Sequence, residues 1–556
     1  MTGPQDQSDR EVLAGLIERV TFHNAENGFC VLRLKARGHR DLVTVVGHAA
    51  TISAGEWVTA SGEWINDRTH GLQFKARFLK TSAPMTMPTV SSARTGTLRR
   101  VDQLQRAFEQ ALGDHVGLSP ALSDMAEQAR RRYGALIGKV QPAFMRAVER
   151  HGWPAPGRLA NTDVFDRFVA PLLAETGRRV AFIIVDALRY ELGVALADQL
   201  GDGQAVEVHA ACAPLPTITP VGMAALLPGA SAGLALRRSD TGPVPELDGT
   251  PLPGVAQRMQ VLRGRFGDRF AEHVLKDFVK KPPRIAETVG LLVLRDTEID
   301  AHLETAPDTA LGVLQTMLRQ IRRAVGQVRE AGFHDVVIAT DHGFFLNGQA
   351  EAGDVCTRPP GDWVTVHHRS LLGEGDGDGA TVAMPAAHVG IRGDFGRFAG
   401  PRSMAPYRRG LLYFHGGASL QEAIVPVLTL RLTSETAPVS AKASVTLRYR
   451  KGATKKINSR LPVIEISVEN ADLFSQAAPV EMLVEAQDRK GNVVGEPKAG
   501  GAVNAASGTV SVMPGQTAQV TLKMALEFEG RFLVKALNPT TQALYATLEL
   551  ETDYVV

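Results

Sequence analysis

Three apolar segments of the chain stop abruptly on acidic or imidazole side chains. They read RVAFIIVDA from residue 179, GLLVLRDTEID from residue 290 and DVVIATDHGF from residue 335. Apolar runs without polar alternation are typical of parallel strands that are buried on both faces. Helical patterns such as ALGVLQTMLRQIRRAVGQV lie between these runs. Strands that alternate with helices predict a doubly wound α/β domain.

The polar residues at the strand ends predict a site. In open α/β sheets, ligands bind beyond the carboxyl ends of the strands. Asp186, Asp341 and His342 end two of the runs, and His415 ends a fourth run, LLYFHGG. One such residue alone is usually a helix cap or a hydrogen-bonded side chain. Four at the same edge of one sheet favour a metal site, and mixed carboxylate and imidazole ligands suit zinc or manganese better than magnesium.

Two threonines in the stretch APLPTITPVGMAALLPG raise a question of chemistry. Pro220 suits the first position of a helix, which makes Thr219 the expected N-cap. A hydroxyl beside a divalent cation also has a lowered pKa and can act as a nucleophile. The cap and the nucleophile can therefore be the same residue.

The remaining regions differ in pattern from the α/β region. Short β-rich runs within residues 1–80 predict a small barrel, and residues 81–97 are rich in Ser, Thr and Pro, as linkers are. Residues 98–177 have helical spacing. The α/β domain is expected at 178–432, and seven short strands within 440–556 predict a β-sandwich.

The composition excludes several protein classes. The 556 residues carry a formal net charge of only +2, so the charge of the whole chain does not indicate a nucleic-acid or membrane partner. Three cysteines far apart support neither a disulfide framework nor a thiolate zinc site. No apolar run approaches the roughly 20 residues of a membrane span. We expect a cytoplasmic protein without a membrane partner.

Four motifs in the same order resemble the PglZ domain of the alkaline phosphatase superfamily. They are VDALRYE, PLPTITPVGMAALLP, TDHGF and FHGGASLQEAIVP, and they span roughly residues 178–432. The family is known from BREX-type phage defence. The resemblance implies two divalent metal ions, zinc or manganese, on either side of a Ser or Thr nucleophile. It also implies other phage-defence proteins as partners.

The resemblance implies a role for each matching residue. The related nucleotide pyrophosphatase/phosphodiesterases use the second threonine of a PTxT stretch, which here is Thr219, so Thr217 is expected to be structural. One metal would be held by Asp186, Asp341, His342 and Thr219. The other would be held by His415 and an acidic motif. Arg189 is a candidate phosphate contact, or else a partner in a surface ion pair.

The acidic motif departs from the pattern of the superfamily, which is an Asp followed by a His four residues later. In RDTEIDAHLE, Asp300 matches the Asp, but Glu304 stands four residues on. Positions four apart share a helix face, so we expect Asp300 and Glu304 to be the ligands. His302 is the alternative if this segment is extended.

The N-terminal region resembles the OB-type domain of RecD-like DNA helicases over about residues 14–80. No G-x-x-x-x-G-K-[ST] loop follows, so helicase activity is not implied. Such a barrel can bind single-stranded DNA by stacking bases on aromatic side chains, although aromatics in a small barrel usually fill its core. The aromatic candidates are Phe22, Phe29, Trp57, Trp64 and Phe74.

The sequence therefore predicts a metal-dependent phosphohydrolase, either a phosphodiesterase or a phosphatase, that acts on a phosphate ester in phage defence. Two alternatives remain at this point. One is a phosphomutase-like enzyme. The other is a catalytically degenerate scaffold, or a nucleic-acid-binding component, of a defence complex.

Overall fold

The structure is a computed structural model of the 556-residue chain. It describes residues 11–554 apart from 25–27, 37, 40, 50–51, 53–56, 68–70, 83–93, 114–118, 201–205, 241, 348–354, 409–410, 433–443, 451–454, 470–478, 490–492, 499–500, 505–507 and 540–543. The expected linker therefore lies mostly outside the described residues. The chain divides into two compact units, residues 1–99 with 142–151 and residues 100–141 with 152–556.

The first unit contains a closed five-stranded barrel, as the sequence predicted. Its strand order is β1-β2-β3-β5-β4. Of the aromatic candidates, Phe74 is fully buried in the barrel core, whereas Phe22 is half exposed. The side chain of Trp57 lies outside the described residues. The strands are β1 (Glu11–His23), β2 (Phe29–Ala36), β3 (Val43–His48), β4 (Trp57–Asp67) and β5 (Gly71–Ser82).

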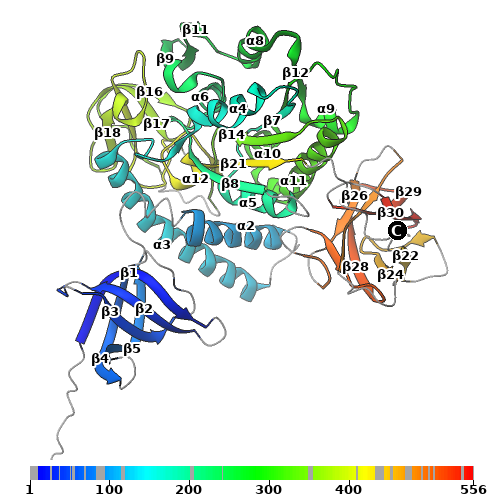
Figure 1. The fold of residues 1–556 in the computed structure, drawn as a ribbon, viewed down its shortest axis with the longest axis horizontal. Coiled ribbons are helices and arrows are strands. Elements are labelled where there is room, and N and C mark those ends of the chain that lie inside the picture. The colour runs from blue at the N-terminus through cyan, green and yellow to red at the C-terminus, as the bar shows by residue number, and fades with distance from the viewer. Residues whose placement is uncertain are drawn as a thin grey trace, which may run out of the picture. The chain divides into compact units, whose positions relative to one another are not determined.

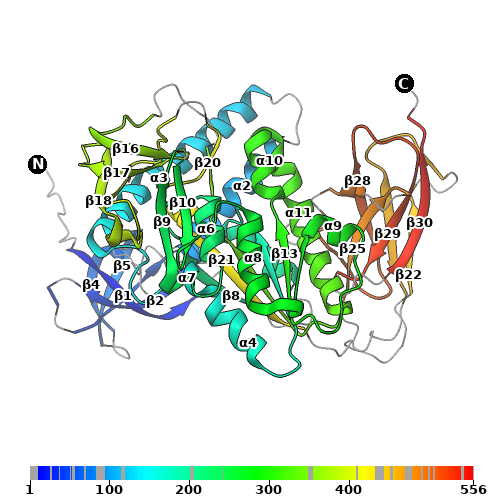
Figure 2. The same ribbon diagram turned by 90° about the horizontal axis from the view of Figure 1, so that it is seen from above.

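The second unit is built around a seven-stranded sheet of order β12-β13-β7-β14-β21-β8-β6 (Figures 1 and 2). Strand β21 runs antiparallel to both of its neighbours, and the other pairs are parallel. The strands are β6 (Leu159–Ala160), β7 (Val180–Val185), β8 (Val206–Cys212), β12 (Phe270–Val274), β13 (Leu291–Asp296), β14 (Asp335–Thr340) and β21 (Ile424–Arg431).

The unbroken apolar runs are explained by helices on both faces of this sheet. In β7, Ala181, Ile183 and Val185 enter one hydrophobic cluster, while Val180, Phe182 and Ile184 enter the other. The doubly wound expectation is therefore confirmed. On the first face lie α5 (Tyr190–Leu200), α9 (Leu275–Lys280), α10 (Glu298–Thr305) and α11 (Pro307–Glu330). On the second lie α4 (Ala170–Ala174), α6 (Thr219–Ala225), α7 (Ala230–Gly233) and α8 (Val255–Phe266).

The sheet takes in residues that precede the expected start at 178. Strand β6 pairs in parallel with β8, although the sequence indicated only helix between 98 and 177. Two residues are too few to give a strand pattern. The long helices of this region are α2 (Arg99–Gly113) and α3 (Pro120–His151), and the short turns are η1 (Arg94–Leu98), η2 (Asn161–Asp163) and η3 (Phe165–Val169).

Three small sheets are inserted between the strands of the main sheet. They are formed by β9 (Leu234–Ser239), β10 (Gly242–Leu247) and β11 (Thr250–Pro251); by β15 (Phe345–Leu346) and β20 (Tyr413–Phe414); and by β16 (Gly361–Val366), β17 (Ser370–Gly375), β18 (Thr381–Pro385) and β19 (Arg397–Pro401). The connecting turns η4 (Gly267–Arg269) and η5 (Ala386–Val389) and helix α12 (Leu420–Ala423) complete this part.

The C-terminal strands enclose one hydrophobic core, as a β-sandwich does. Ile464 and Ile466 from one half of the strand path enter the same cluster as Val484 and Val534 from the other half. Two short strands, β23 and β26, were not expected. The strands are β22 (Val445–Tyr449), β23 (Lys456–Ile457), β24 (Val463–Val468), β25 (Val480–Gln487), β26 (Val493–Pro497), β27 (Val510–Val512), β28 (Thr517–Met524), β29 (Arg531–Leu537) and β30 (Leu544–Thr552).

None of the helices that the structure describes is both long enough and apolar enough to cross a membrane.

Candidate metal and phosphoester site

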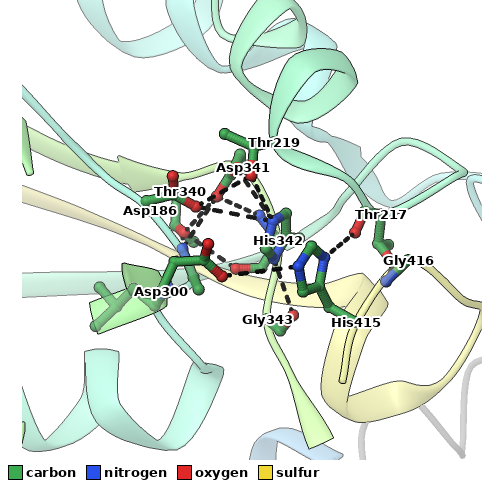
Figure 3. Close-up of polar contacts among 12 residues, drawn as sticks. Asp186, Thr217, Thr219, Asp300, Thr340, Asp341, His342, Gly343, His415 and Gly416 are labelled. Atoms are coloured by element: carbon green, nitrogen blue, oxygen red, sulfur yellow. Dashed lines mark hydrogen bonds and ion pairs between the residues drawn. The ribbon is translucent and has the colours of Figure 1, made fainter. Parts of the chain in front are cut away.

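The site begins at the carboxyl ends of the neighbouring strands β7 and β14. Asp186 follows β7 directly, and Asp341 and His342 follow β14. The parallel pairing of these strands brings the three residues together (Figure 3). The turn after β7 is fixed by β14, because the backbone N–H of Ala187 donates to Asp341 Oδ1 at 3.1 Å and that of Leu188 donates to Thr340 Oγ1 at 2.9 Å.

The carboxylate of Asp341 is satisfied on one side only. Its Oδ1 also accepts from the N–H of His342 at 2.8 Å, whereas its buried Oδ2 has no hydrogen-bond partner. Oδ2 lies 3.3 Å from His342 Nε2, which in turn lies 3.8 Å from Asp186 Oδ1. Three acceptor atoms thus face one another in a buried space.

Thr219 belongs to this group, but not as the cap that the sequence predicted. Helix α6 begins at Thr219 itself, Ile218 is the N-cap, and no side chain caps the helix. The prediction of Pro220 as the first helical residue was therefore wrong by one position. The hydroxyl of Thr219 instead lies 3.5 Å from Asp186 Oδ1 and 3.3 Å from His342 Nε2 (Figure 3). It is free of a capping role and directed at the acceptor cluster.

His415 reaches the site by a different route from the one expected. It follows β20, which pairs with β15 in a separate two-stranded sheet, so it does not end a strand of the main sheet. Short apolar runs look alike in sequence whether they join a large or a small sheet. The ring of His415 stacks on that of His342, with centroids 4.1 Å apart and planes inclined by 12°.

Each of these two imidazoles has one nitrogen held by a backbone carbonyl. His342 Nδ1 lies 3.0 Å from the carbonyl oxygen of Gly343, and His415 Nδ1 lies 3.0 Å from that of Thr217. A carbonyl accepts, so Nδ1 carries the proton in both rings, and Nε2 is the nitrogen directed into the cluster. Metal-binding histidines are typically oriented in this way.

Thr217 is occupied in holding the loop of His415. Its Oγ1 donates to the carbonyl oxygen of Gly417 at 2.7 Å and accepts from the N–H of Gly416 at 3.1 Å. The side chain is fully buried. Both hydrogen-bonding functions of this hydroxyl are thus used within the protein.

The acidic motif lies on α10, so its residues are related by helical spacing. Asp300 Oδ1 is 3.7 Å and Glu304 Oε1 is 4.0 Å from His415 Nε2. The phenol of Tyr413 donates to Asp300. The ring of His302 instead contacts its own helix, since its Nδ1 lies 2.8 Å from the carbonyl oxygen of Glu298. Among the described residues, Glu304 and His415 belong to one group of possible metal ligands, and His302 belongs to none.

Burial and mutual repulsion shift the ionisation of these groups. Burial, followed by the charges of Asp341 and Asp300, raises the pKa of Asp186 well above its usual range. Burial raises the pKa of Asp341 to about 6 and lowers the pKa of His342 to about 3. Burial also acts to lower the pKa of His415, but Glu304 and Asp300 outweigh it and raise that pKa. The protein alone therefore resists a fully charged carboxylate cluster.

These residues fit divalent cations. Asp341 Oδ2 and His415 Nε2 are buried polar atoms without a hydrogen-bond partner, which is costly unless something else binds them. Among the described residues, three groups of ligand atoms contain both carboxylate and imidazole: Asp186 with Asp341 and His342, Asp300 with His342 and His415, and Glu304 with His367 and His415. Mixed oxygen and nitrogen donors suit zinc or manganese.

Arg189, the expected phosphate contact, is placed elsewhere. Its guanidinium is buried, and Nη2 lies 3.4 Å from Asp102 Oδ1 of α2. The guanidinium carbon Cζ lies over the ring of Phe344, 5.3 Å from the ring centroid. Arg189 forms an ion pair, as the alternative held, but in the interior and not on the surface. The sequence could not show this, because Asp102 lies far away in the helical region.

Two residues near the site were missed by sequence reasoning. Arg258 of α8 is buried, and the charges of Asp341 and Asp186 act on its pKa, which burial lowers. The ring of His367 lies 4.0 Å from that of His415. The only signal for His367 was the doublet VTVHHRS after a short strand, which lacks the regular spacing of a metal motif.

Comparison with known families gives two matches. Residues 164–430 match the BREX system PglZ alkaline phosphatase-like domain, and residues 10–84 match the OB-fold domain of the ATP-dependent DNA helicase YrrC. Both agree with the resemblances seen in the sequence. The PglZ match begins ahead of the expected boundary at 178, as the main sheet itself does.

Two curated proteins are similar to this chain. The alkaline phosphatase-like protein BrxZ of Escherichia coli O9:H4 (strain HS) is 27% identical over 361 residues, which cover 61% of this chain and 41% of that protein. The alkaline phosphatase-like protein PglZ of Bacillus cereus (strain H3081.97) is 25% identical over 358 residues, 61% of this chain and 40% of that protein. The chain spans less than half the length of either relative.

Solved structures with a similar fold include murine ectonucleotide pyrophosphatase/phosphodiesterase 5, with 9% identity and a TM-score of 0.32 over 45% of this chain and 88% of that chain. Another is phosphonoacetate hydrolase from Sinorhizobium meliloti 1021 with phosphonoformate, with 14% identity and a TM-score of 0.29 over 47% of this chain and 92% of that chain. From the two family matches, this chain carries a domain of the PglZ alkaline phosphatase-like family over residues 164–430, preceded by an OB-fold domain over residues 10–84.

Proposed function

We propose that this domain is a two-cation phosphoester hydrolase in which Thr219 is the nucleophile. The observation that carries the proposal is the position of the Thr219 hydroxyl, 3.5 Å from Asp186 Oδ1 and 3.3 Å from His342 Nε2, at a helix start where it caps nothing. The match to an alkaline phosphatase-like family supports the same class of reaction.

One cation would be held by Asp186, Asp341, His342 and Thr219, and the other by Asp300, Glu304 and His415. Zinc, or alternatively manganese, is the metal that this donor set favours. When bound, such ions supply positive charge that stabilises an ionised hydroxyl and the charge that develops on the phosphoryl group.

The protein's own part in the reaction is to position Thr219. Asp186 and His342 orient its hydroxyl, and the packing of α6 fixes the direction of attack. Thr219 Oγ1 bonds to phosphorus as the bond to the leaving alcohol breaks, and the alcohol departs with a proton. Water then releases the phosphoryl group and restores the hydroxyl. Such covalent catalysis divides one difficult step into two easier ones.

Three variants test the assignment at matched bound metal: Thr219→Ala, Thr219→Ser and Thr217→Ala. We expect Thr219→Ala to remove nearly all turnover of p-nitrophenyl phosphate and bis-p-nitrophenyl phosphate. Thr219→Ser should retain part of it, because it preserves the hydroxyl. Thr217→Ala should retain substantial activity if the loop of His415 stays folded. Turnover by Thr219→Ala at close to the wild-type rate would show that another group attacks phosphorus.

The biological setting is a proposal as well. The PglZ family description names a BREX system, so we propose phage defence as the process and other defence proteins as partners. The barrel is a candidate binding module for single-stranded DNA. Phe22 and Phe78 are large aromatic side chains that are 51% and 64% exposed on it, and exposed aromatics are the stacking surfaces that such modules use.

A further inference from the structure

A third imidazole lies at the second cation position. His367 Nε2 is 3.7 Å from Glu304 Oε1, and its ring centroid is 4.0 Å from that of His415. The ligand atoms of Glu304, His367 and His415 all lie within 4.8 Å of one another. Around a tetrahedral zinc ion with bonds near 2.0–2.1 Å, ligand atoms are about 3.3 Å apart. Glu304 Oε1 lies 3.7 Å from His367 Nε2 and 4.0 Å from His415 Nε2, which exceeds that value by about 0.4 and 0.7 Å.

The backbone at His367 is held in an uncommon conformation. The residue lies in the turn between β16 and β17 and has a φ of 53°, which side chains larger than glycine rarely adopt. Such strain persists only where surrounding structure enforces it, and it gathers at functional sites. A turn whose only purpose was to connect two strands would be more stable with Gly or Asn at this position.

The surrounding structure that enforces this turn is the loop of His415. The guanidinium of Arg369 forms a fully buried ion pair with Glu422 of α12 and donates to the carbonyl oxygen of Ser403 at 2.9 Å. Ser370 Oγ donates to the carbonyl oxygen of Gly416. A Cβ added to Gly416 would lie 2.9 Å from His367 Cβ, so the glycine leaves the room that His367 occupies.

The donors at this position fit a zinc ion. Glu304 supplies a carboxylate oxygen, and His367 and His415 each supply an imidazole nitrogen. A carboxylate and two imidazoles form a common zinc ligand set.

We infer that His367 is a direct ligand of the second cation, together with Glu304 and His415. The inference rests on the two-cation site proposed above. It assigns to the inserted β16–β17 hairpin a part in building that site, which none of the motifs in the sequence indicated. The position four residues after Asp300 holds a carboxylate, and the hairpin supplies an imidazole from a different part of the chain.

The first test removes the imidazole and keeps the backbone. Asn tolerates the left-handed region, so His367→Asn avoids the strain that Ala would meet. Zinc binding to the full chain is measured by elemental analysis and by competition with a chromophoric chelator. We expect two equivalents for wild type, and for His367→Asn either the loss of one equivalent or an affinity at least 10-fold weaker at one site. His302→Asn is the matched control on α10 and should bind as wild type does.

The second test reports ligation directly. Cobalt(II) bound to a thiolate gives a near-ultraviolet charge-transfer absorption. The three native cysteines Cys30, Cys212 and Cys356 are buried, and none belongs to a group of ligand side chains among the described residues. We expect His367→Cys to show this band with cobalt and His302→Cys to lack it. A purely packing role for His367 cannot produce the band.

Two results would overturn the inference. One is a His367→Asn protein that binds two zinc ions with wild-type affinity. The other is a His367→Cys protein that binds two cobalt ions without the thiolate band. Neither result depends on turnover. If Thr219 is not the nucleophile but two metals bind, the nucleophile assignment fails while this inference stands.

Discussion

Gly222 determines how closely the nucleophile helix approaches the metal-binding strand end. It lies within α6, three residues after Thr219, and is buried. A Cβ added at this position would lie 2.6 Å from the Cβ and 2.7 Å from the carbonyl oxygen of Asp341. Ordinary contact begins at 3.4 Å, so Gly222→Ala must push the helix from the strand end by up to about 0.8 Å.

The cost of this change can be worked out from opposing terms. Overpacking a core typically costs about 1–3 kcal/mol, and the upper half applies because the contacted atoms include backbone that cannot rotate away. Replacing Gly by Ala within a helix raises the free energy of unfolding by about 1 kcal/mol, because Ala has the higher helix propensity. We expect a net loss of about 1–2 kcal/mol in the free energy of unfolding.

The effect on catalysis should be larger than the effect on stability. The displacement separates Thr219 from Asp186 and His342, and an error of about 1 Å in the position of a reacting group can cost about 100-fold in rate. We expect kcat for bis-p-nitrophenyl phosphate to fall by about 10- to 100-fold, with a smaller change in KM.

The matched control is Gly264→Ala. Gly264 lies on α8, and a Cβ added there would meet nothing within 4 Å. It should stabilise the protein by about 0.4–1 kcal/mol and leave kcat unchanged. Urea unfolding measures the stability of both variants, and steady-state kinetics measures their kcat. If Gly222→Ala were as stable and as active as Gly264→Ala, the close contact between α6 and Asp341 would not position Thr219.

Three further predictions follow from other parts of the structure. Arg369→Leu leaves the buried Glu422 carboxylate without its ion pair and should lower the free energy of unfolding by about 3–5 kcal/mol. An unchanged urea concentration at the midpoint of unfolding would contradict this. In metal-free protein, the raised pKa of Asp341 gives a contribution to stability that is complete below the usual Asp range and is lost as pH rises through about 6, so wild type should lose melting temperature relative to Asp341→Asn between about pH 4 and 6, and a difference that does not change with pH would contradict this. Phe22→Ala and Phe78→Ala should each weaken binding of the full chain to a single-stranded oligonucleotide, and this binding should decrease steeply as the salt concentration rises. If neither substitution weakened the binding, these exposed aromatic side chains would not be the surface that binds the oligonucleotide.

The sequence predicted the parts of the site that local pattern determines. Asp186 and Asp341 end apolar runs because parallel strands buried on both faces must be apolar until they leave the sheet. The same pattern misassigned the strand of His415, because a two-residue strand such as β20 has too few residues to reveal its partner. The start of α6 was displaced by one residue, because Pro is accepted at either of the first two helical positions.

The parts that long-range packing determines were not predictable in this way. Arg189 pairs with Asp102, which lies 87 positions earlier, and burial of that pair depends on how α2 meets α5. His367 depends on a hairpin whose tip is held by Arg369 and Glu422, two residues that form no motif. Neither the Arg189–Asp102 pair nor the contacts that hold the hairpin of His367 produces a periodic pattern in the sequence. A doublet of histidines after a strand is informative only once its neighbours are known.

The charge of the cluster gives an independent reason to expect two divalent ions. Asp186, Asp341, Asp300 and Glu304 supply four carboxylates around imidazoles whose carbonyl-bound Nδ1 atoms leave Nε2 free for a metal. Without ions, burial raises the pKa values of Asp186 and Asp341, and Glu304 and Asp300 raise the pKa of His415 against the effect of burial, which keeps protons in the cluster. Two divalent cations would neutralise the four carboxylates when those protons leave, whereas one would leave two negative charges uncompensated. Uptake of zinc should therefore release protons, and the number released per metal should be greatest below about pH 6, where the carboxylic acids still hold them. Calorimetry in two buffers of different ionisation enthalpy measures that number, and uptake without proton release at pH 5.5 would refute the charge argument.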